Sequence, residues 1–390
     1  MKCESCDTCL DAFTHENLRT SPLIGNYLPG RVQSRREFLK WGAAWALGIG
    51  LSAFVADEVA ERVYGVSDSP QPRSKVSIAK GEELEDITRE AIDLLGGIRS
   101  VIDPGDKVFI KPNFVGFGGY IENVRDTVRN GQCTKLEVVH TVAEECLKTG
   151  ASKVTIGEGG QGIMMPWEGP KTLDGKKNMP QLVAELNETY GVKVSLKALN
   201  AATPYWVFIP SMTDLRKIAV PSFAMEADKV ISIPVVKTHH SYATTLGMKN
   251  FVGITPVSLY GTPRVRLHGS DPGMPQVIID LTKGLQPDLA VIDCSIGAEG
   301  QAPAVPPGET VNVKERIGGY LMIASRDFLA ADATATRVIG HNPDWIKYMR
   351  WAYEQNVGQK DEDKIEVVGE PVESVQMNWK PAETSGYPQI

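Results

Sequence analysis

The chain lacks an excess of positive charge. Its 390 residues contain 41 Lys and Arg against 48 Asp and Glu, which gives a formal net charge of -7 at pH 7 and a pI of about 5.5. Proteins that bind nucleic acid need basic stripes that neutralise the phosphate backbone. The charge balance therefore argues against nucleic acid as the main partner.

The chain beyond residue 75 also lacks the short motifs that identify a reaction. GxSxG, HExxH, the Walker A loop and paired CxxC motifs are all missing there, and GEGGQG is not the GxGxxG dinucleotide fingerprint. Heptads and repeats of solenoid length are missing as well. A catalytic site in this chain must therefore be inferred from scattered polar residues.

Cysteine is too sparse for a disulfide framework, since a chain of 390 residues has only six. Cys133, Cys146 and Cys294 are far apart, fit no metal motif and are odd in number. Cys146 lies on an apolar helical face and Cys294 ends an apolar strand, so we expect both to be buried thiols.

The other cysteines form a CxxCxxC pattern in a leader, residues 1–33. Cys3, Cys6 and Cys9 have a spacing that suits thiolates gathered on iron–sulfur or zinc, with His15 as a candidate fourth ligand. A disordered, reducible leader without metal is the favoured interpretation. A redox or metal check before export is the alternative.

Residues 34–56 have the pattern of an export signal. The sequence SRREFLK contains Arg35 and Arg36 and precedes WGAAWALGIGLSAFVA, an uncharged run that is short for a spanning helix of about 20 residues. We therefore expect recognition by the twin-arginine export machinery and a periplasmic location. Phe54 makes cleavage after Ala56 unfavourable, so an uncleaved anchor that faces the periplasm is the alternative.

Apolar strands and amphipathic helices alternate after a linker at residues 57–74. This order predicts one α/β domain over residues 75–370, with a mostly parallel sheet covered by helices on both faces, and a C-terminal tail over 371–390. We expect one continuous strand over 228–240. A further helix is expected to begin near Asp332, with this aspartate as its cap.

Polar residues gather at the carboxyl ends of four expected strands, in the sequences KPN, GEGG, KTHH and DCSIGAEG. In such sheets ligands bind at the carboxyl ends of the strands, so these segments predict a shared polar rim. We expect the rim to bind a small anionic substrate. The candidate binding residues are Lys111, Asn113, Lys237 and Asn250.

Candidate catalytic residues lie in the same segments. Lys249 follows Gly247 in apolar surroundings, where burial lowers the pKa of a lysine so that it can act as a base or nucleophile. His239 and His240 are adjacent, so on a regular backbone only one would face the site. Glu158 lies between two glycines as a general base or metal ligand, with a plain tight turn as the alternative.

Two further carboxylates flank the sequence SIGA. Asp293 and Glu299 are candidate metal ligands or acid–base groups. Arg264, Arg266 and His268 lie in a loop rich in Gly and Pro, where anion binding is one interpretation and a solvated loop the favoured one.

Over residues 107–369 the order and spacing of these segments resemble domain of unknown function family 362. The resemblance is carried by KPN, KVISIPVVKTHHSYATTLGMKNFVGITP, PDLAVIDCSIGAEGQAP and SRDFLAADATATRVIG. Some members of that family have ferredoxin-like cysteine clusters, which this body lacks. The amino-terminal half of nickel-dependent lactate racemases is more distantly similar, with a histidine and a glycine-flanked lysine that serve the cofactor. His239, Gly247 and Lys249 have the matching order.

The sequence therefore predicts an exported metal- or cofactor-dependent enzyme for a small anionic substrate. A metal ion or an iron–sulfur cluster is the candidate cofactor. The alternative is a non-catalytic exported module that binds a ligand or helps to assemble a redox complex containing an iron–sulfur protein.

Overall fold

The computed structural model describes residues 73–115, 128–160, 165–200, 206–300 and 308–382. The expected export signal and the leader residues Cys3, Cys6 and Cys9 lie outside the described residues. The described residues all belong to one compact unit, Asp68–Ile390. Among them, no helix combines the length and the apolar character that crossing a membrane requires.

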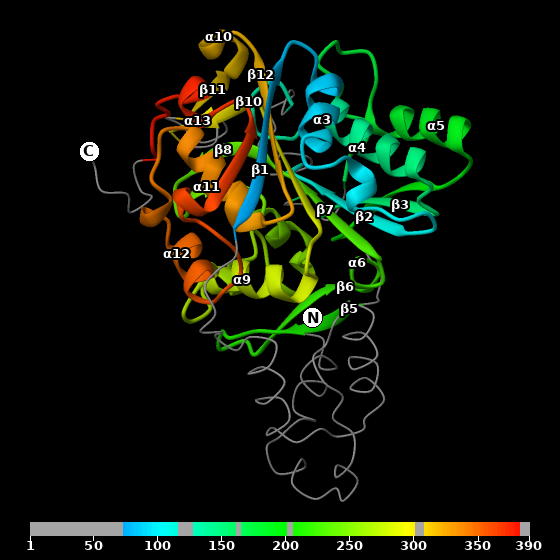
Figure 1. Ribbon diagram of the computed structural model, residues 1–390. Helices are drawn as coiled ribbons and strands as arrows, with labels where there is room; N and C mark the ends of the chain where they lie inside the picture. Colours follow the sequence, from blue (N-terminus) through cyan, green and yellow to red (C-terminus); the bar gives the residue numbers. More distant parts are fainter. Residues whose placement is uncertain (1–72, 116–127, 161–164, 201–205, 301–307, 383–390) are drawn as a thin grey trace, which may run out of the picture. The chain divides into compact units, whose positions relative to one another are not determined.

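A mixed sheet of eleven strands forms the centre of the described residues (Figure 1). Along its main path the strands are β13 (Ile365–Gly369), β1 (Ser74–Gly81), β12 (Tyr320–Ser325), β10 (Leu289–Glu299), β7 (Lys229–Ile233), β2 (Lys107–Pro112), β3 (Lys153–Glu158) and β4 (Val194–Ala198). Neighbours from β10 to β4 run parallel, and β12 runs antiparallel to β1 and β10. The predicted mostly parallel α/β fold is confirmed.

Helices cover both faces of this sheet (Figure 1). One layer contains α3 (Leu84–Asp93), α4 (Leu136–Thr149) and α5 (Met179–Tyr190), and the other contains α9 (Met274–Leu285), α11 (Phe328–Val338) and α12 (Lys347–Glu354). Because both faces are covered, consecutive residues of a central strand are all buried: Val108, Phe109 and Ile110 of β2 are at most 1% exposed.

The prediction of one continuous strand over 228–240 is wrong, because Pro234 interrupts the strand. β7 ends at Ile233, and β8 (Val235–His239) pairs instead with β10 and with β9 (Ala243–Thr245). A proline has no N–H for a central ladder, although its carbonyl still accepts a 2.8 Å hydrogen bond from the N–H of Asp293. The KTHH sequence therefore lies in a hairpin of its own.

The expected helix start near Asp332 is also wrong. Helix α11 begins at Phe328, and its N-cap is Asp327, whose side chain accepts a 3.0 Å hydrogen bond from the N–H of Ala330. Asp332 lies one turn inside the helix and is fully buried. Its carboxylate is therefore available for contacts with another element.

Several elements had no clear sequence signal. β5 (Trp206–Pro210) and β6 (Lys217–Pro221) form a separate two-stranded sheet, and β11 (Glu309–Asn312) extends β10. The short helices are α6 (Ser222–Met225), α7 (Val257–Tyr260), α8 (Val265–His268), α10 (Val313–Ile317) and α13 (Val372–Val375), and the 3-10 helices are η1 (Ile98–Ser100), η2 (Lys249–Ile254), η3 (Pro343–Trp345) and η4 (Glu362–Lys364).

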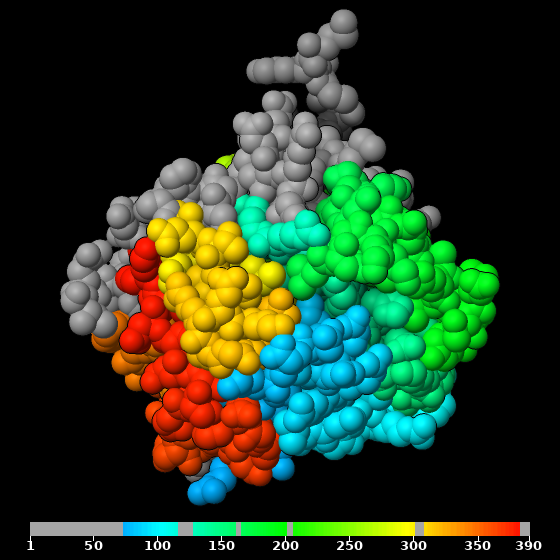
Figure 2. Space-filling model, turned by 90° about the horizontal axis from the view of Figure 1, so that it is seen from above, coloured from blue at the N-terminus to red at the C-terminus, as the bar shows by residue number. Residues whose placement is uncertain are grey.

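Residues 371–382, within the expected tail, pack onto the body. Val375 is fully buried and Trp379 is 3% exposed. The backbone N–H of Trp379 donates to Ile339 O at 3.0 Å. Figure 2 shows the red C-terminal residues beside the blue residues of β1 and α3, in agreement with the parallel pairing of β13 and β1.

Candidate functional site

The polar segment 237–253 is built from the β8–β9 hairpin and η2, and a buried aspartate holds the turn between them. The N–H groups of Gly247 and Met248 donate to the Asp332 carboxylate at 2.7 and 3.1 Å, and Tyr348 Oη donates to it at 3.3 Å. Burial raises the pKa of Asp332 to about 7. Residue 247 must be small, since a Cβ there would approach Asp332 Oδ1 to 2.9 Å. Asp332 thereby fixes the backbone that presents Lys249.

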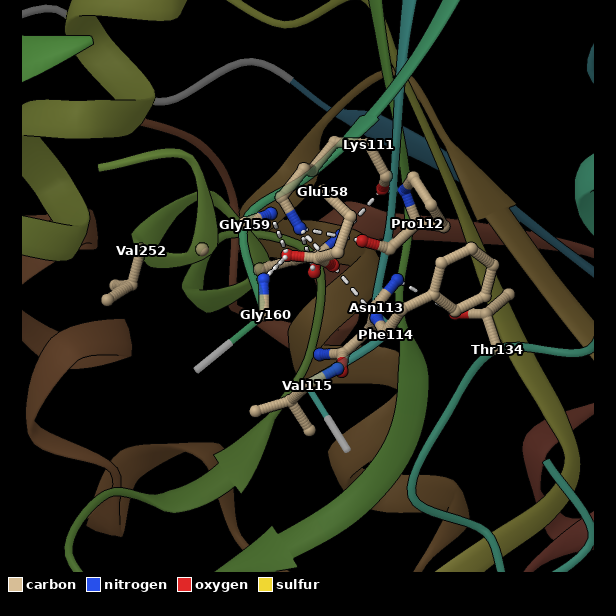
Figure 3. Close-up of polar contacts among 12 residues, drawn as sticks. Lys111, Pro112, Asn113, Phe114, Val115, Thr134, Glu158, Gly159, Gly160 and Val252 are labelled. Carbon is tan, nitrogen blue, oxygen red and sulfur yellow. Dashed lines mark hydrogen bonds and ion pairs between the residues drawn. The ribbon is translucent and has the colours of Figure 1, made fainter. Parts of the chain in front are cut away.

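Lys111 and Glu158 form a buried ion pair where β2 and β3 end (Figure 3). Lys111 Nζ lies 2.7 Å from Glu158 Oε2, and the two side chains are 1% and 2% exposed. The carboxylate also accepts backbone N–H hydrogen bonds from Phe114 at 2.8 Å, Gly159 at 2.7 Å and Gly160 at 3.0 Å. The oxygens of Glu158 are thus saturated by donors from the protein itself.

Asn250 connects this pair to η2. Its Nδ2 donates to Lys111 O at 2.7 Å and to Ser232 Oγ at 3.0 Å, and its Oδ1 lies 3.4 Å from Lys111 Nζ. Gly253 lies directly over the pair, because an added Cβ would meet Lys111 Nζ at 2.9 Å. Burial lowers the pKa of Lys111, and the Glu158 carboxylate opposes this effect. Lys111, Glu158 and Asn250, here called the buried tier, bind β2, β3, β7 and η2 together.

Lys237 is a second buried lysine, but it has no carboxylate partner among the described residues. Its Nζ donates to Gln132 O at 2.7 Å and to Asn113 Oδ1 at 3.3 Å, and the residue is 4% exposed. Burial lowers the pKa of Lys237 to about 8; nearby Cys133 and Glu158 oppose the shift. Asn113 therefore serves to orient Lys237.

Lys249 is the least compensated cation of the site. Within the described ranges its ammonium group has no ion-pair partner, and its contact is the ring of Tyr242, whose centroid is 5.5 Å from Nζ. Burial, together with the charges of Lys237 and Arg264, lowers the pKa of Lys249 to about 7. The residue as a whole is partly exposed, so part of its side chain reaches solvent.

The histidines form a chain of rings beside Lys249. His239 and His240 stack with centroids 4.6 Å apart, His239 lies 5.4 Å from Tyr242, and Tyr242 Oη lies 2.8 Å from His268 Nδ1. The expectation that the two adjacent histidines point apart is wrong, because β8 ends at His239 and strand alternation ends with it. Burial and the charge of Lys249 lower the pKa of His239, His240 and His268, so we expect neutral imidazoles at pH 7.

Asp293 and Glu299 lie on β10, and the carboxylate of each is already bonded to other residues of the protein. Asp293 accepts from the N–H of Ser295 at 3.0 Å and of Lys135 at 2.9 Å, and Lys135 Nζ lies 3.5 Å away. Glu299 forms an ion pair with Arg316 at 2.6 Å. In the part of the chain that the structure describes, no three His, Cys, Asp or Glu side chains gather into a metal-ligand set.

The favoured interpretation of a solvated loop is wrong for Arg264, whose side chain is buried. It is 4% exposed and donates to the carbonyls of Gly160, Gly253 and Thr255 at 2.9 to 3.0 Å. Arg266 and His268 are exposed, as expected. Cys146 and Cys294 are buried free thiols, which confirms that prediction.

The chain has matches among protein families, known proteins and solved structures. The family model described as "Domain of unknown function (DUF362)" matches residues 108–337. The "Thylakoid-associated protein sll1697" of Synechocystis sp. is 25% identical over 296 residues, which cover 75% of this chain and 81% of that protein. The lactate racemase apoprotein from Thermoanaerobacterium thermosaccharolyticum aligns with a TM-score of 0.35 and 13% identity, covering 63% of this chain and 56% of the other.

Proposed function

The chain belongs to the DUF362 family of unknown function, and from this premise we propose that it is an exported enzyme acting on a small anionic substrate beside the β8–β9 hairpin. One observation carries the proposal: Lys237 and Lys249 are buried or partly buried cations for which the described residues provide no carboxylate partner. An uncompensated cation in such surroundings is costly unless an anion joins it. A bound anion supplies the missing charge.

Each residue of the cluster then has a separate role. Lys237 holds the anionic group of the substrate, and the charge of Lys249 close to it strengthens the attraction while Lys249 is protonated. Lys249, with a pKa of about 7, is partly neutral at pH 7 and is therefore suited to act as a base or nucleophile. The neutral imidazole of His239 is available for proton transfer. The buried tier fixes the ends of β2 and β3, and the charges of its Lys111 and Glu158 act on Lys237.

One experiment tests for a bound cofactor and distinguishes the proposed enzyme from the non-catalytic assembly module. We propose that the enzyme is loaded with a metal or cofactor before export, as the expected twin-arginine route allows. Elemental analysis and native mass spectrometry of protein from the periplasm, with and without Lys249→Ala, are expected to find a stoichiometric metal or adduct. A protein without either that still co-purifies with a redox subunit would instead support the non-catalytic assembly module.

Anion binding is expected to weaken as pH rises above 7. A bound anion favours the charged amines and raises their pKa, so binding takes up protons whenever Lys249 (about 7) or Lys237 (about 8) is partly neutral. The affinity is then greatest below pH 7 and falls by up to about tenfold per pH unit for each proton taken up. The nearby groups His239, His240 and His268 have lowered pKa values and stay neutral over this range.

The measurement is calorimetric titration of acetate and sulfate between pH 6 and pH 9, since neither anion titrates there. In Lys249→Met the decline should begin only near pH 8, where Lys237 loses its proton. An affinity that is constant across the range would contradict the role of the amines.

Export is expected to depend on the arginine pair. Changing Arg35 and Arg36 together to lysine keeps the charge but removes the planar guanidinium groups, and we expect the protein to stay in the cytoplasm. Lys40→Arg is the matched control, because it alters a basic residue outside the pair. Immunoblots of periplasmic and cytoplasmic fractions give the result. Normal periplasmic accumulation of the double variant would exclude this route.

A further inference from the structure

Two hydroxyls of the β8–β9 hairpin are buried without a hydrogen-bond partner. Thr238 is 1% exposed and Thr245 is 4% exposed, and the Oγ1 atom of each has no partner in the described structure. Buried hydroxyls are almost always hydrogen-bonded, so an unpaired one requires an explanation. Thr238 lies on β8 together with Lys237, and Thr245 lies on β9, the partner strand of β8.

The register of the hairpin separates the two hydroxyls. Lys237 lies opposite Thr245, and Thr238 lies opposite Thr244. Cross-strand partners share a face of the sheet and successive residues alternate, so Thr245 is on the face of Lys237 while Thr238 is on the other. On that other face Thr244 Oγ1 lies 3.3 Å from Tyr348 Oη. Thr245 alone thus accompanies a cation.

We propose that Thr245 Oγ1 and Lys237 Nζ together bind one carboxylate or phosphate group of the substrate. Lys237 donates to Gln132 O and Asn113 Oδ1, which leaves one of the three N–H donors of an ammonium group for a ligand. The hydroxyl of Thr245 supplies a second donor on the same face. An oxyanion can accept both bonds through two oxygens, and the charged acceptor strengthens each of them.

This assignment rests on the proposed function and deepens it. Lys237 and Thr245 would hold the part of the substrate that does not react, so that Lys249 remains available for the reacting part. The site would then select substrates by an oxyanion group that is fixed in orientation, and not by charge alone.

The test compares Thr245→Val with Thr238→Val in the full-length protein. Both changes keep the side-chain volume and remove an unpaired hydroxyl, so neither should lower the melting temperature. Calorimetric titration with acetate and with sulfate, at pH 6.5, is expected to show affinity reduced about tenfold or more by Thr245→Val, the usual effect of losing a hydrogen bond to a charged group. Thr238→Val should stay within about twofold of the unmodified protein.

The outcomes distinguish this inference from the proposed function. A loss for acetate alone assigns a carboxylate, and a loss for sulfate alone assigns a tetrahedral oxyanion such as phosphate. Equal effects of the two valine variants, or unchanged affinity in Thr245→Val while Lys249→Met loses binding, would overturn the role of Thr245 and leave the proposed function intact. If the unmodified protein binds neither anion, both fail.

Discussion

Replacing Lys249 with methionine is expected to stabilise the protein while weakening its binding of acetate or sulfate by more than about tenfold. The pKa of Lys249 in the folded protein is about 7, below the value of an unfolded chain. At pH 7 the charged form of Lys249 therefore costs free energy in the folded protein. Part of the side chain reaches solvent, so we expect a gain of only about 2 kcal/mol in the free energy of unfolding.

The pH dependence of stability gives a second sign of the same effect. A lysine whose pKa is lowered in the folded state releases its proton on folding as the pH rises. It therefore lowers the free energy of unfolding fully below pH 7, and this destabilisation disappears above the pKa of the unfolded chain. Urea unfolding at pH 7 and pH 10 should therefore show the difference between Lys249→Met and the unmodified protein shrinking at high pH. Lys197→Met, a change of an exposed lysine on β4, is the control.

The opposite result would assign Lys249 a different role. A methionine variant that is less stable than the unmodified protein, yet binds both anions normally, would show that the lysine supports the fold. The proposed enzyme would then lose its candidate base.

Replacing Glu158 with glutamine is expected to lower the free energy of unfolding by about 3–5 kcal/mol. The change leaves the ammonium group of Lys111 buried without an opposite charge. An amide also has one acceptor oxygen in place of the two that serve Lys111 and three backbone N–H groups. Urea unfolding at pH 7 measures the loss, and Lys111→Met combined with Glu158→Gln should restore part of it.

An exposed pair in the same protein provides the control. Glu185 forms an ion pair with Lys177 at 2.8 Å, and the two side chains are 45% and 46% exposed. Glu185→Gln should change stability by less than about 1 kcal/mol. If Glu158→Gln is as stable as the unmodified protein, the structural role assigned to the buried tier is wrong, and the general base predicted from the sequence becomes the better assignment for Glu158.

Local sequence patterns predicted most of the elements that build the sheet. The apolar runs of β2, β3 and β10 and the periodic faces of α3, α4 and α9 are short-range signals, and the structure contains these elements close to their expected bounds. The antiparallel position of β12 between β1 and β10 had no such signal, because strand order depends on contacts far apart in the sequence.

The candidate site was predictable as a collection of residue types but not as an arrangement. The sequence indicated Lys111, Lys237 and Lys249. Only the fold shows that Lys111 has a carboxylate partner and that the described residues provide none for Lys237 and Lys249. Asp332 was assigned to a helix cap because its contacts to Gly247 and Met248 span more than eighty residues. The importance of Thr245 rests on a hairpin register that appears only in the fold.

The charge state of Lys249 tests the proposed site most directly. Lysines labelled with ¹³C at Cε can be titrated by NMR, and Lys249→Met assigns the signal. We expect this signal to titrate near pH 7 in the free protein and at a clearly higher pH with saturating acetate or sulfate. Titration near the ordinary value of about 10.4, with no change on adding either anion, would contradict the assignment of Lys249 to an anion-binding site.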